Sequence, residues 1–98
     1  MAKAYWINTF RTIHDPERLQ AYIALAGPAV RAAGGRFLAR GDPAAAFESG
    51  TRTRTTLIEF PSVEAAVAAY HSRDYQQALA ALGDAAERDL RIIEAVEP

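Results

Sequence analysis

Four short apolar segments, separated by helix-forming stretches, constrain what this chain can fold into. Residues 4–10, 37–39, 55–60 and 90–94 are rich in aromatic and β-branched side chains, which favour the pleated surface of a sheet. The first segment is almost continuously apolar up to Ile7, which indicates that both faces of a strand are covered at that end. We therefore predict four strands.

Capping residues delimit the first helix. Asp15-Pro16-Glu17 opens it, because aspartate accepts hydrogen bonds from free backbone N–H groups and proline has the φ angle of a first turn. Apolar residues follow at helical spacing as far as Ala33, and Gly34-Gly35 ends the helix. Gly27-Pro28 interrupts this stripe. We expect a kink or a restarted helix there, because proline removes one helical hydrogen bond.

Two serines predict the start of further helices in the second half of the chain. Ser62 caps a helix that runs to about Tyr70, and Ser72 caps another that carries Tyr75 on its apolar face. Residues 42–52 are rich in proline, serine, glycine and charge, which is typical of a long hairpin connection. This connection contains Phe47, an aromatic side chain that we expect to fold back onto its own protein or to contact a partner.

The resulting order is the ferredoxin-like plan βαββαβ, an α+β fold with a four-stranded antiparallel sheet and helices on one face. The whole chain, residues 1–98, has the size of a single domain. Successive side chains of a strand point to opposite faces, and large apolar residues occur at both even and odd positions. The even positions carry Trp6, Leu38, Ile58 and Phe60, and the odd positions carry Ile7, Phe37 and Leu57. Because helices cover one face, we expect a second subunit to cover the other, giving a homodimer.

Composition excludes several classes of function. Eleven basic and twelve acidic residues give a net charge of −1, so no overall field attracts nucleic acid. The absence of cysteine excludes disulfides, zinc–thiolate sites and thiol catalysis. No apolar run approaches the roughly 18 residues of a membrane span, and the N-terminus lacks the regions of a signal peptide. We expect a cytoplasmic protein without nucleic-acid or membrane partners.

Several short segments, in this order over nearly the whole chain, carry a family resemblance: AYWI at 4–7, GGRFLARG at 34–41, IEFPS at 58–62, YHSRDYQ at 70–76, then Asp89 and Ile93-Glu94. With these segments the chain resembles the small bacterial proteins of domain-of-unknown-function family 1330. The resemblance implies a dimeric α+β barrel, in which two ferredoxin-like subunits pack sheet to sheet. Related barrel families include cofactor-free monooxygenases, isomerases, lyases and dechlorinating enzymes acting on small ring compounds, and also proteins without known activity.

Glu59 and His71 are the candidate catalytic residues. A carboxylate within an apolar strand must either be paired with a cation or have a raised pKa. A raised pKa is what a general base needs. The alternatives for Glu59 are a structural ion pair with Arg40 or Arg54 on neighbouring strands, or helix capping near Ser62. His71 lies between two helix caps, where an imidazole suits acid–base chemistry near neutral pH. Its alternative is a local hydrogen bond at a helix corner.

Four residues are candidates for ligand binding. Asn8 places an amide in an apolar strand and therefore needs hydrogen-bond partners. Arg40 and Arg54, on the paired middle strands, could hold a substrate carboxylate through bidentate hydrogen bonds. Tyr75 would add a second polar group. The alternatives are ion pairs for the arginines and a core position for the tyrosine.

The two histidines, His14 and His71, do not have the spacing of metal ligands, so we expect neither a metal nor a cofactor. Haem binding, known in some related barrels, would require one of these two residues as the axial ligand.

These features lead to one hypothesis and one alternative. The hypothesis is a homodimer that binds a small, partly apolar acid or ring compound between sheet and helices, with cofactor-free acid–base chemistry. Glu59 would act as the base, Arg40 or Arg54 would hold the anion, and Tyr75 or His71 would supply the second polar group. The alternative is a non-catalytic ligand-binding or accessory dimer. The sequence leaves open whether the chain is an enzyme.

Overall fold

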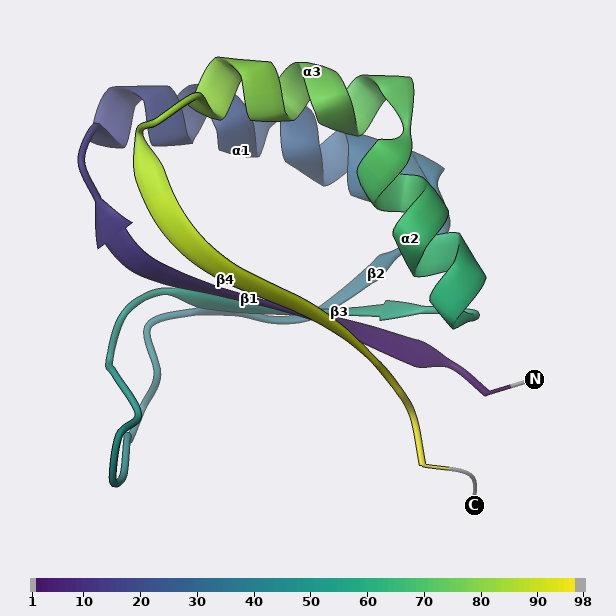
Figure 1. The fold of residues 1–98 in the computed structure, drawn as a ribbon, viewed down its shortest axis with the longest axis horizontal. Helices are drawn as coiled ribbons and strands as arrows, with labels where there is room; N and C mark the ends of the chain where they lie inside the picture. Colours follow the sequence, from purple (N-terminus) through teal and green to yellow (C-terminus); the bar gives the residue numbers. More distant parts are fainter. Residues whose placement is uncertain (1, 97–98) are drawn as a thin grey trace.

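A four-stranded antiparallel sheet covered on one face by three helices forms the fold (Figure 1). The computed structural model describes residues 2–96. Its elements are β1 (Ala4–Ile13), α1 (Pro16–Ala32), β2 (Arg36–Gly41), β3 (Thr55–Phe60), α2 (Val63–His71), α3 (Arg73–Leu82) and β4 (Ala86–Glu94). The strand order is β2-β3-β1-β4, and every neighbouring pair is antiparallel. This confirms the predicted ferredoxin-like plan, with its second helical region divided in two at Ser72.

The predicted caps hold the three helix N-termini. The Asp15 carboxylate accepts hydrogen bonds from the backbone N–H groups of Glu17 and Arg18, at 3.1 and 3.3 Å. Ser62 Oγ accepts a hydrogen bond from the N–H of Ala65 at 3.0 Å, and Ser72 Oγ accepts one from the N–H of Tyr75 at 3.2 Å. Each cap satisfies backbone donors that the helix itself leaves free, so these polar side chains fix where each helix begins.

The first helix differs from its prediction at Gly27-Pro28. α1 runs without a break from Pro16 to Ala32 and contains Pro28. A restarted helix at that point is therefore wrong. Proline deprives the carbonyl of Ala24 of its helical partner, but Ala24 and Pro28 both lie on the exposed side of the helix. Water can hydrogen-bond that carbonyl, which allows the helix to continue.

A β-bulge decides which side of β2 faces the helices. The register of β2 with β3 shifts between Phe37 and Ala39, and Phe37 lies opposite Ile58. Phe37 therefore packs against the core on the helix side, whereas Leu38 is 41% exposed. Residues at positions of the same parity in different strands need not share a face of the sheet, because a bulge shifts the register between the strands.

Two strands are longer than their apolar segments. β1 continues to Ile13 and β4 already begins at Ala86, and Figure 1 shows these ends curling up towards the helices. The carbonyl of Ala85 accepts hydrogen bonds from the N–H groups of His14 and Asp15, at 2.7 and 3.1 Å. The added residues are largely polar or charged, so an apolar pattern could not predict them.

The sheet face opposite the helices, which we call the open face, carries both apolar and charged side chains. Ile7 lies opposite Leu57 and Arg91 in the strand register, and Ile93 is 57% exposed. The helices cover only the other face of the sheet. The connection between β2 and β3 extends away on the side of the open face (Figure 1). Phe47 in this connection is 80% exposed, so it does not fold back onto its own protein.

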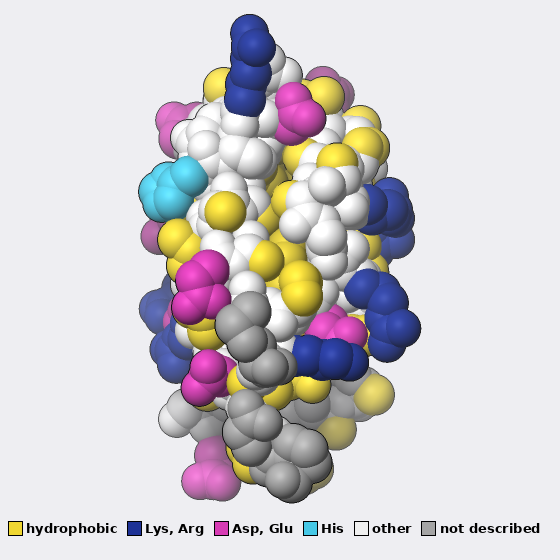
Figure 2. All heavy atoms as spheres, turned by 90° about the vertical axis from the view of Figure 1, so that its right-hand side faces the viewer, with side chains coloured by type: hydrophobic (Ala, Val, Ile, Leu, Met, Phe, Trp, Pro, Cys, Tyr) yellow, Lys and Arg dark blue, Asp and Glu magenta, His cyan; other side chains and the backbone are white. Residues whose placement is uncertain are grey.

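The surface carries charges of both signs. At the end of the molecule shown in Figure 2, basic and acidic side chains are interspersed around apolar side chains. This end therefore offers no broad positive surface of the kind that binds a phosphate backbone. No helix within residues 2–96 is long and apolar enough to cross a membrane.

Gly35 allows α1 and β3 to approach each other closely. A Cβ atom at this position would lie 2.6 Å from Val30 Cγ1 and 2.8 Å from Phe60 Cζ. We expect Gly35→Ala to lower the free energy of unfolding by about 1–3 kcal/mol, because overpacking displaces buried neighbours. Gly27→Ala is the matched control, since its Cβ would meet the mobile end of Arg31 at 3.3 Å and alanine favours a helix. Urea unfolding followed by circular dichroism measures both, and equal stability of the Gly35 variant and the wild type would contradict the prediction.

Candidate functional site

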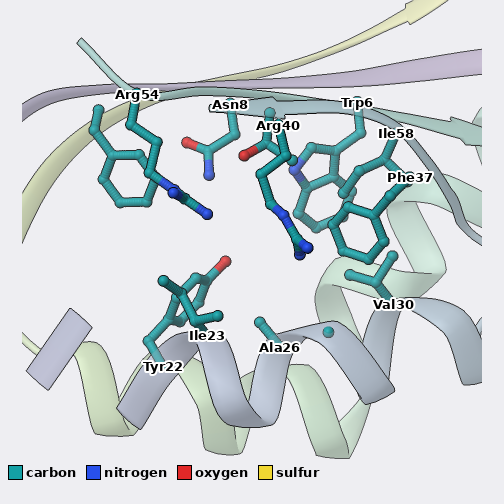
Figure 3. Close-up of a pocket in the computed structure, with 13 residues that line it drawn as sticks. Trp6, Asn8, Tyr22, Ile23, Ala26, Val30, Phe37, Arg40, Arg54 and Ile58 are labelled. Atoms are coloured by element: carbon teal, nitrogen blue, oxygen red, sulfur yellow. The ribbon is translucent and has the colours of Figure 1, made fainter. Parts of the chain in front are cut away.

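A cavity lies between the helix-facing side of the sheet and α1 (Figure 3). It holds about 430 Å³ of unoccupied space out to its open mouth, of which about 40 Å³ can contain the centre of a water molecule. Its apolar walls are formed by Trp6, Ile58 and Phe37 on the sheet and by Val30 on α1. Such a concave, mostly apolar site with a few polar groups is typical of small-molecule binding.

Asn8 presents a buried polar atom to this cavity without a hydrogen-bond partner. Asn8 is 4% exposed, and its Oδ1 atom has no partner among the residues that the structure describes. The side chain points from the central strand β1 into the cavity (Figure 3). Leaving such an acceptor unsatisfied costs roughly 1–3 kcal/mol. The amide is therefore positioned to bind something that the chain itself does not supply.

Two arginines point into the cavity on either side of Asn8. Arg40 comes from β2, and Arg54 immediately precedes β3, where its carbonyl accepts a hydrogen bond from the N–H of Phe10 at 3.0 Å. Figure 3 shows both guanidinium groups extending towards the space between sheet and helix. Within residues 2–96 neither arginine forms an ion pair, and no Asp or Glu lines the cavity. The cavity is therefore positively charged.

A hydrogen-bonded group of two phenols and a third arginine lies at the helix side of the cavity. The hydroxyl oxygens of Tyr22 and Tyr75 are 2.6 Å apart. Arg88 Nη1 donates to the hydroxyl of Tyr22 at 2.8 Å and to that of Tyr75 at 3.3 Å. Burial, reinforced by the neighbouring Tyr22, raises the pKa of Tyr75 well above its ordinary range, so this phenol keeps its proton. Tyr22 lines the cavity, with its hydroxyl directed into it (Figure 3).

The structure brings three of the predicted site residues together. Asn8, Arg40 and Arg54 all line the cavity, and Tyr75 reaches it indirectly through the hydroxyl of Tyr22. Tyr22 looks like an ordinary core residue in the sequence, because it belongs to the apolar stripe of a helix. Arg88 lies in the polar beginning of β4 and carries no signal in the sequence.

The two predicted catalytic residues lie elsewhere. Glu59 alternates with Ile58, so its side chain belongs to the open face, where Lys3 Nζ lies at 3.4 Å and Arg36 Nη2 at 3.9 Å. The ion pair considered as an alternative for Glu59 thus exists, but with these partners instead of the predicted arginines. His71 is exposed at the end of α2, with its ring 5.4 Å from that of Tyr70. Neither predicted catalytic side chain lines the cavity.

The other histidine, His14, does not line the cavity either. His14 is exposed, and its Nε2 lies 3.0 Å from a carboxylate oxygen of Glu87. Across the described part of the chain, no three His, Asp or Glu side chains gather into a cluster that could hold a metal ion. The polar groups of the cavity itself are an amide, hydroxyls and guanidinium groups, which suit an organic anion better than a metal.

The family of the chain follows from its sequence as a whole. The family described as domain of unknown function (DUF1330) matches residues 3–96. The chain belongs to the DUF1330 family. This confirms the resemblance carried by its short segments. No curated protein matches the chain.

Solved structures similar to this DUF1330 protein share its fold. A protein of unknown function from Rhodopseudomonas palustris is 19% identical, with a TM-score of 0.76 over 99% of this chain and 85% of that one. SnoaB from Streptomyces nogalater, a cofactor-independent oxygenase, is 14% identical, with a TM-score of 0.69 over 100% and 97%. A dimeric ferredoxin-like protein of unknown function from Thermobifida fusca is 17% identical, with a TM-score of 0.67 over 96% and 92%. At these identities the likeness concerns the fold.

Proposed function

We propose that this DUF1330 protein is a homodimer that binds a small, partly apolar organic anion between its sheet and α1. The observation that carries the proposal is the positive charge without a counter-ion around an apolar cavity. Arg40 and Arg54 point into it, and no carboxylate of residues 2–96 lines the cavity. An anion that pairs with these two guanidinium groups forms charge-assisted hydrogen bonds and is bound favourably.

The arrangement favours a carboxylate attached to one ring or a short apolar group. A guanidinium group matches the two oxygens of a carboxylate, and two guanidinium groups can hold one between them. Trp6 and Phe37 provide flat apolar walls for a ring. The inner space holds only about three water molecules, so the ligand must also occupy the mouth. Arg40 is exposed there, with its guanidinium group over the ring of Phe37 at 5.1 Å.

Binding is better supported than acid–base catalysis. Glu59 and His71 do not reach the cavity, and the described lining contains no Asp, Glu or His. The oxygenase activity of SnoaB belongs to a protein that is 14% identical, and we do not assign it to this chain.

The open face supports the homodimeric part of the proposal. Ile7 and Leu57 are half-buried at its centre, and Ile93 is 57% exposed. Apolar residues on an uncovered sheet face favour burial against a second sheet. The cavity lies on the other side of the sheet, so each subunit of such a dimer would keep a binding site of its own.

Benzoate is a suitable probe for the anion site. We expect Arg54→Gln to weaken benzoate binding about tenfold or more, because a hydrogen bond to a charged group contributes roughly 1.5–3 kcal/mol. Isothermal titration calorimetry at millimolar concentrations measures the dissociation constant. Arg36→Gln is the matched control, since this arginine of β2 contacts Glu59 on the open face instead of the cavity. Glu59→Gln is also expected to bind benzoate as the wild type does.

Two results would contradict the proposal. One is that neither benzoate nor cyclohexanecarboxylate binds the wild type at millimolar concentration. The other is that Arg54→Gln and Arg36→Gln weaken binding equally, which would indicate a general effect of surface charge. Benzamide, which has the same ring without the negative charge, should bind more weakly than benzoate to the wild type and to Arg36→Gln, both of which retain Arg54.

A further inference from the structure

We infer that the ligand of this cavity carries a hydroxyl group beside its anionic group, and that Asn8 Oδ1 accepts the hydrogen bond of that hydroxyl. The natural ligand class is then a hydroxylated aromatic acid. This inference rests on the proposed function and specifies its ligand further. Some polar groups around the cavity donate hydrogen bonds and others accept them, and this division selects the ligand.

The first step is that Asn8 offers an acceptor. Its Oδ1 atom is buried and has no partner in the described chain. In the register, Asn8 lies between Thr56 on β3 and Leu90 on β4, and all three side chains share the helix side of the sheet. Leu90 has no polar group, and no hydrogen bond links the hydroxyl of Thr56 to the amide. A partner for Oδ1 must therefore come from within the cavity and must be a donor.

The second step is that Tyr22 offers a donor. Tyr75 is 1% exposed, and its hydroxyl has the oxygen of Tyr22 as its hydrogen-bond acceptor at 2.6 Å. Arg88, the other hydrogen-bond partner of the Tyr75 hydroxyl, can only donate. Tyr75 therefore donates to Tyr22, which avoids a buried donor without an acceptor. Because Arg88 also donates to Tyr22, that oxygen already accepts two hydrogen bonds, and its own proton remains for the cavity.

The third step is that the remaining groups complete an asymmetric pattern. Arg40 and Arg54 add further donors at the mouth. An anionic group near these arginines and Tyr22 would receive several hydrogen bonds. Asn8 Oδ1 cannot interact favourably with that anion, because both are acceptors. A ligand with a carboxylate alone would leave Oδ1 unpaired, whereas a hydroxyl on the same ring would pair with it.

The pattern predicts a measurable preference. A site built to hydrogen-bond a ligand hydroxyl discriminates against the analogue that lacks it. We expect at least one of the three monohydroxybenzoates to bind about fivefold or more tightly than benzoate, and more tightly than the methoxybenzoate substituted at the same position. A methoxy group is a useful comparison because it accepts hydrogen bonds but cannot donate one. Isothermal titration calorimetry on the purified full chain gives the dissociation constants.

Asn8→Leu is the variant that tests the role of the amide. Leucine has the same branched shape and no polar atom, so the variant should lose the preference for the hydroxyl, and its dissociation constants for the hydroxybenzoate and for benzoate should become equal. Thr9→Val is the matched control, because the neighbouring residue points to the open face and the substitution likewise removes a polar atom. It should leave the preference unchanged.

The outcomes separate this inference from the proposed function. If benzoate and all of its derivatives fail to bind, the proposed function is wrong and the inference falls with it. If benzoate binds through Arg54 but hydroxyl groups add nothing, the function stands and the inference is wrong. A preference for methoxybenzoates would also overturn it, since the amide would then be acting as a donor. The wild-type comparison decides the matter even if the Asn8 variant does not fold.

Discussion

Trp6→Ala is expected to lower the free energy of unfolding by about 3–5 kcal/mol, a large part of the total stability of a domain of this size. Trp6 is 1% exposed and lies at the centre of the aromatic core. Its ring stacks on that of Phe60 at 5.7 Å and meets the ring of Tyr75 edge-on at 5.1 Å. Alanine would leave a large void that rigid neighbours on the sheet and helices cannot fill. Urea unfolding followed by far-ultraviolet circular dichroism measures the loss.

Two further variants make the test of Trp6 specific. Val67→Ala removes an apolar side chain that is 42% exposed on α2, so its stability should stay within about 0.5 kcal/mol of the wild type. Trp6→Phe keeps an aromatic ring and should lose less than the alanine variant does. A loss below about 1 kcal/mol in Trp6→Ala would contradict this prediction. It would show that Trp6 acts mainly as a wall of the cavity and contributes little to core packing.

Leu57→Arg is expected to convert the proposed homodimer into a monomer. Leu57 lies opposite Ile7 on β1 and Ala39 on β2, at the middle of the open face. A guanidinium group buried between two sheets without a partner is strongly unfavourable, and two copies would meet across the symmetric interface. Sedimentation velocity or size-exclusion chromatography with light scattering measures the mass.

Leu25→Arg is the matched control for this experiment. It introduces the same charge at a more exposed leucine, 45% exposed, on α1 away from the open face. It should remain dimeric. A wild-type protein that is monomeric would contradict the homodimer, and a folded Leu57→Arg dimer would show that another surface forms the interface. If that variant unfolds, Thr55→Arg places the same charge on the same face at a less apolar position.

Local chemistry explains how much of this fold the sequence predicts. Asp15, Ser62 and Ser72 act on backbone groups a few residues away, so their effect on helix starts can be inferred without the tertiary structure. The order of strands and helices follows from the same short-range signals. Pro28 shows the limit of this approach, because whether proline breaks a helix depends on which side of the helix faces water.

The candidate site was only partly predictable for two separate reasons. Glu59 lies between Ile58 and Phe60, and this alternation already indicates the face away from the helices. The pattern of the strand therefore places Glu59 away from the cavity. The contact between Tyr22 and Arg88 joins residues 66 positions apart, and neither has a pattern that suggests the other. Such a group arises from the pairing of β4 with β1, which no local signal determines.

The walls of the cavity are also the core of the domain, and this has a practical consequence for finding the ligand. Trp6, Ile58 and Val30 are each at most 3% exposed, so a molecule that binds among them binds the folded chain and not the unfolded one. Ligand at a hundred times its Kd then adds about 2.7 kcal/mol of stability. For a domain of this size, each kcal/mol raises the Tm by about 4–8 °C. Thermal melting across a library of small acids can therefore reveal the ligand before any reaction is known.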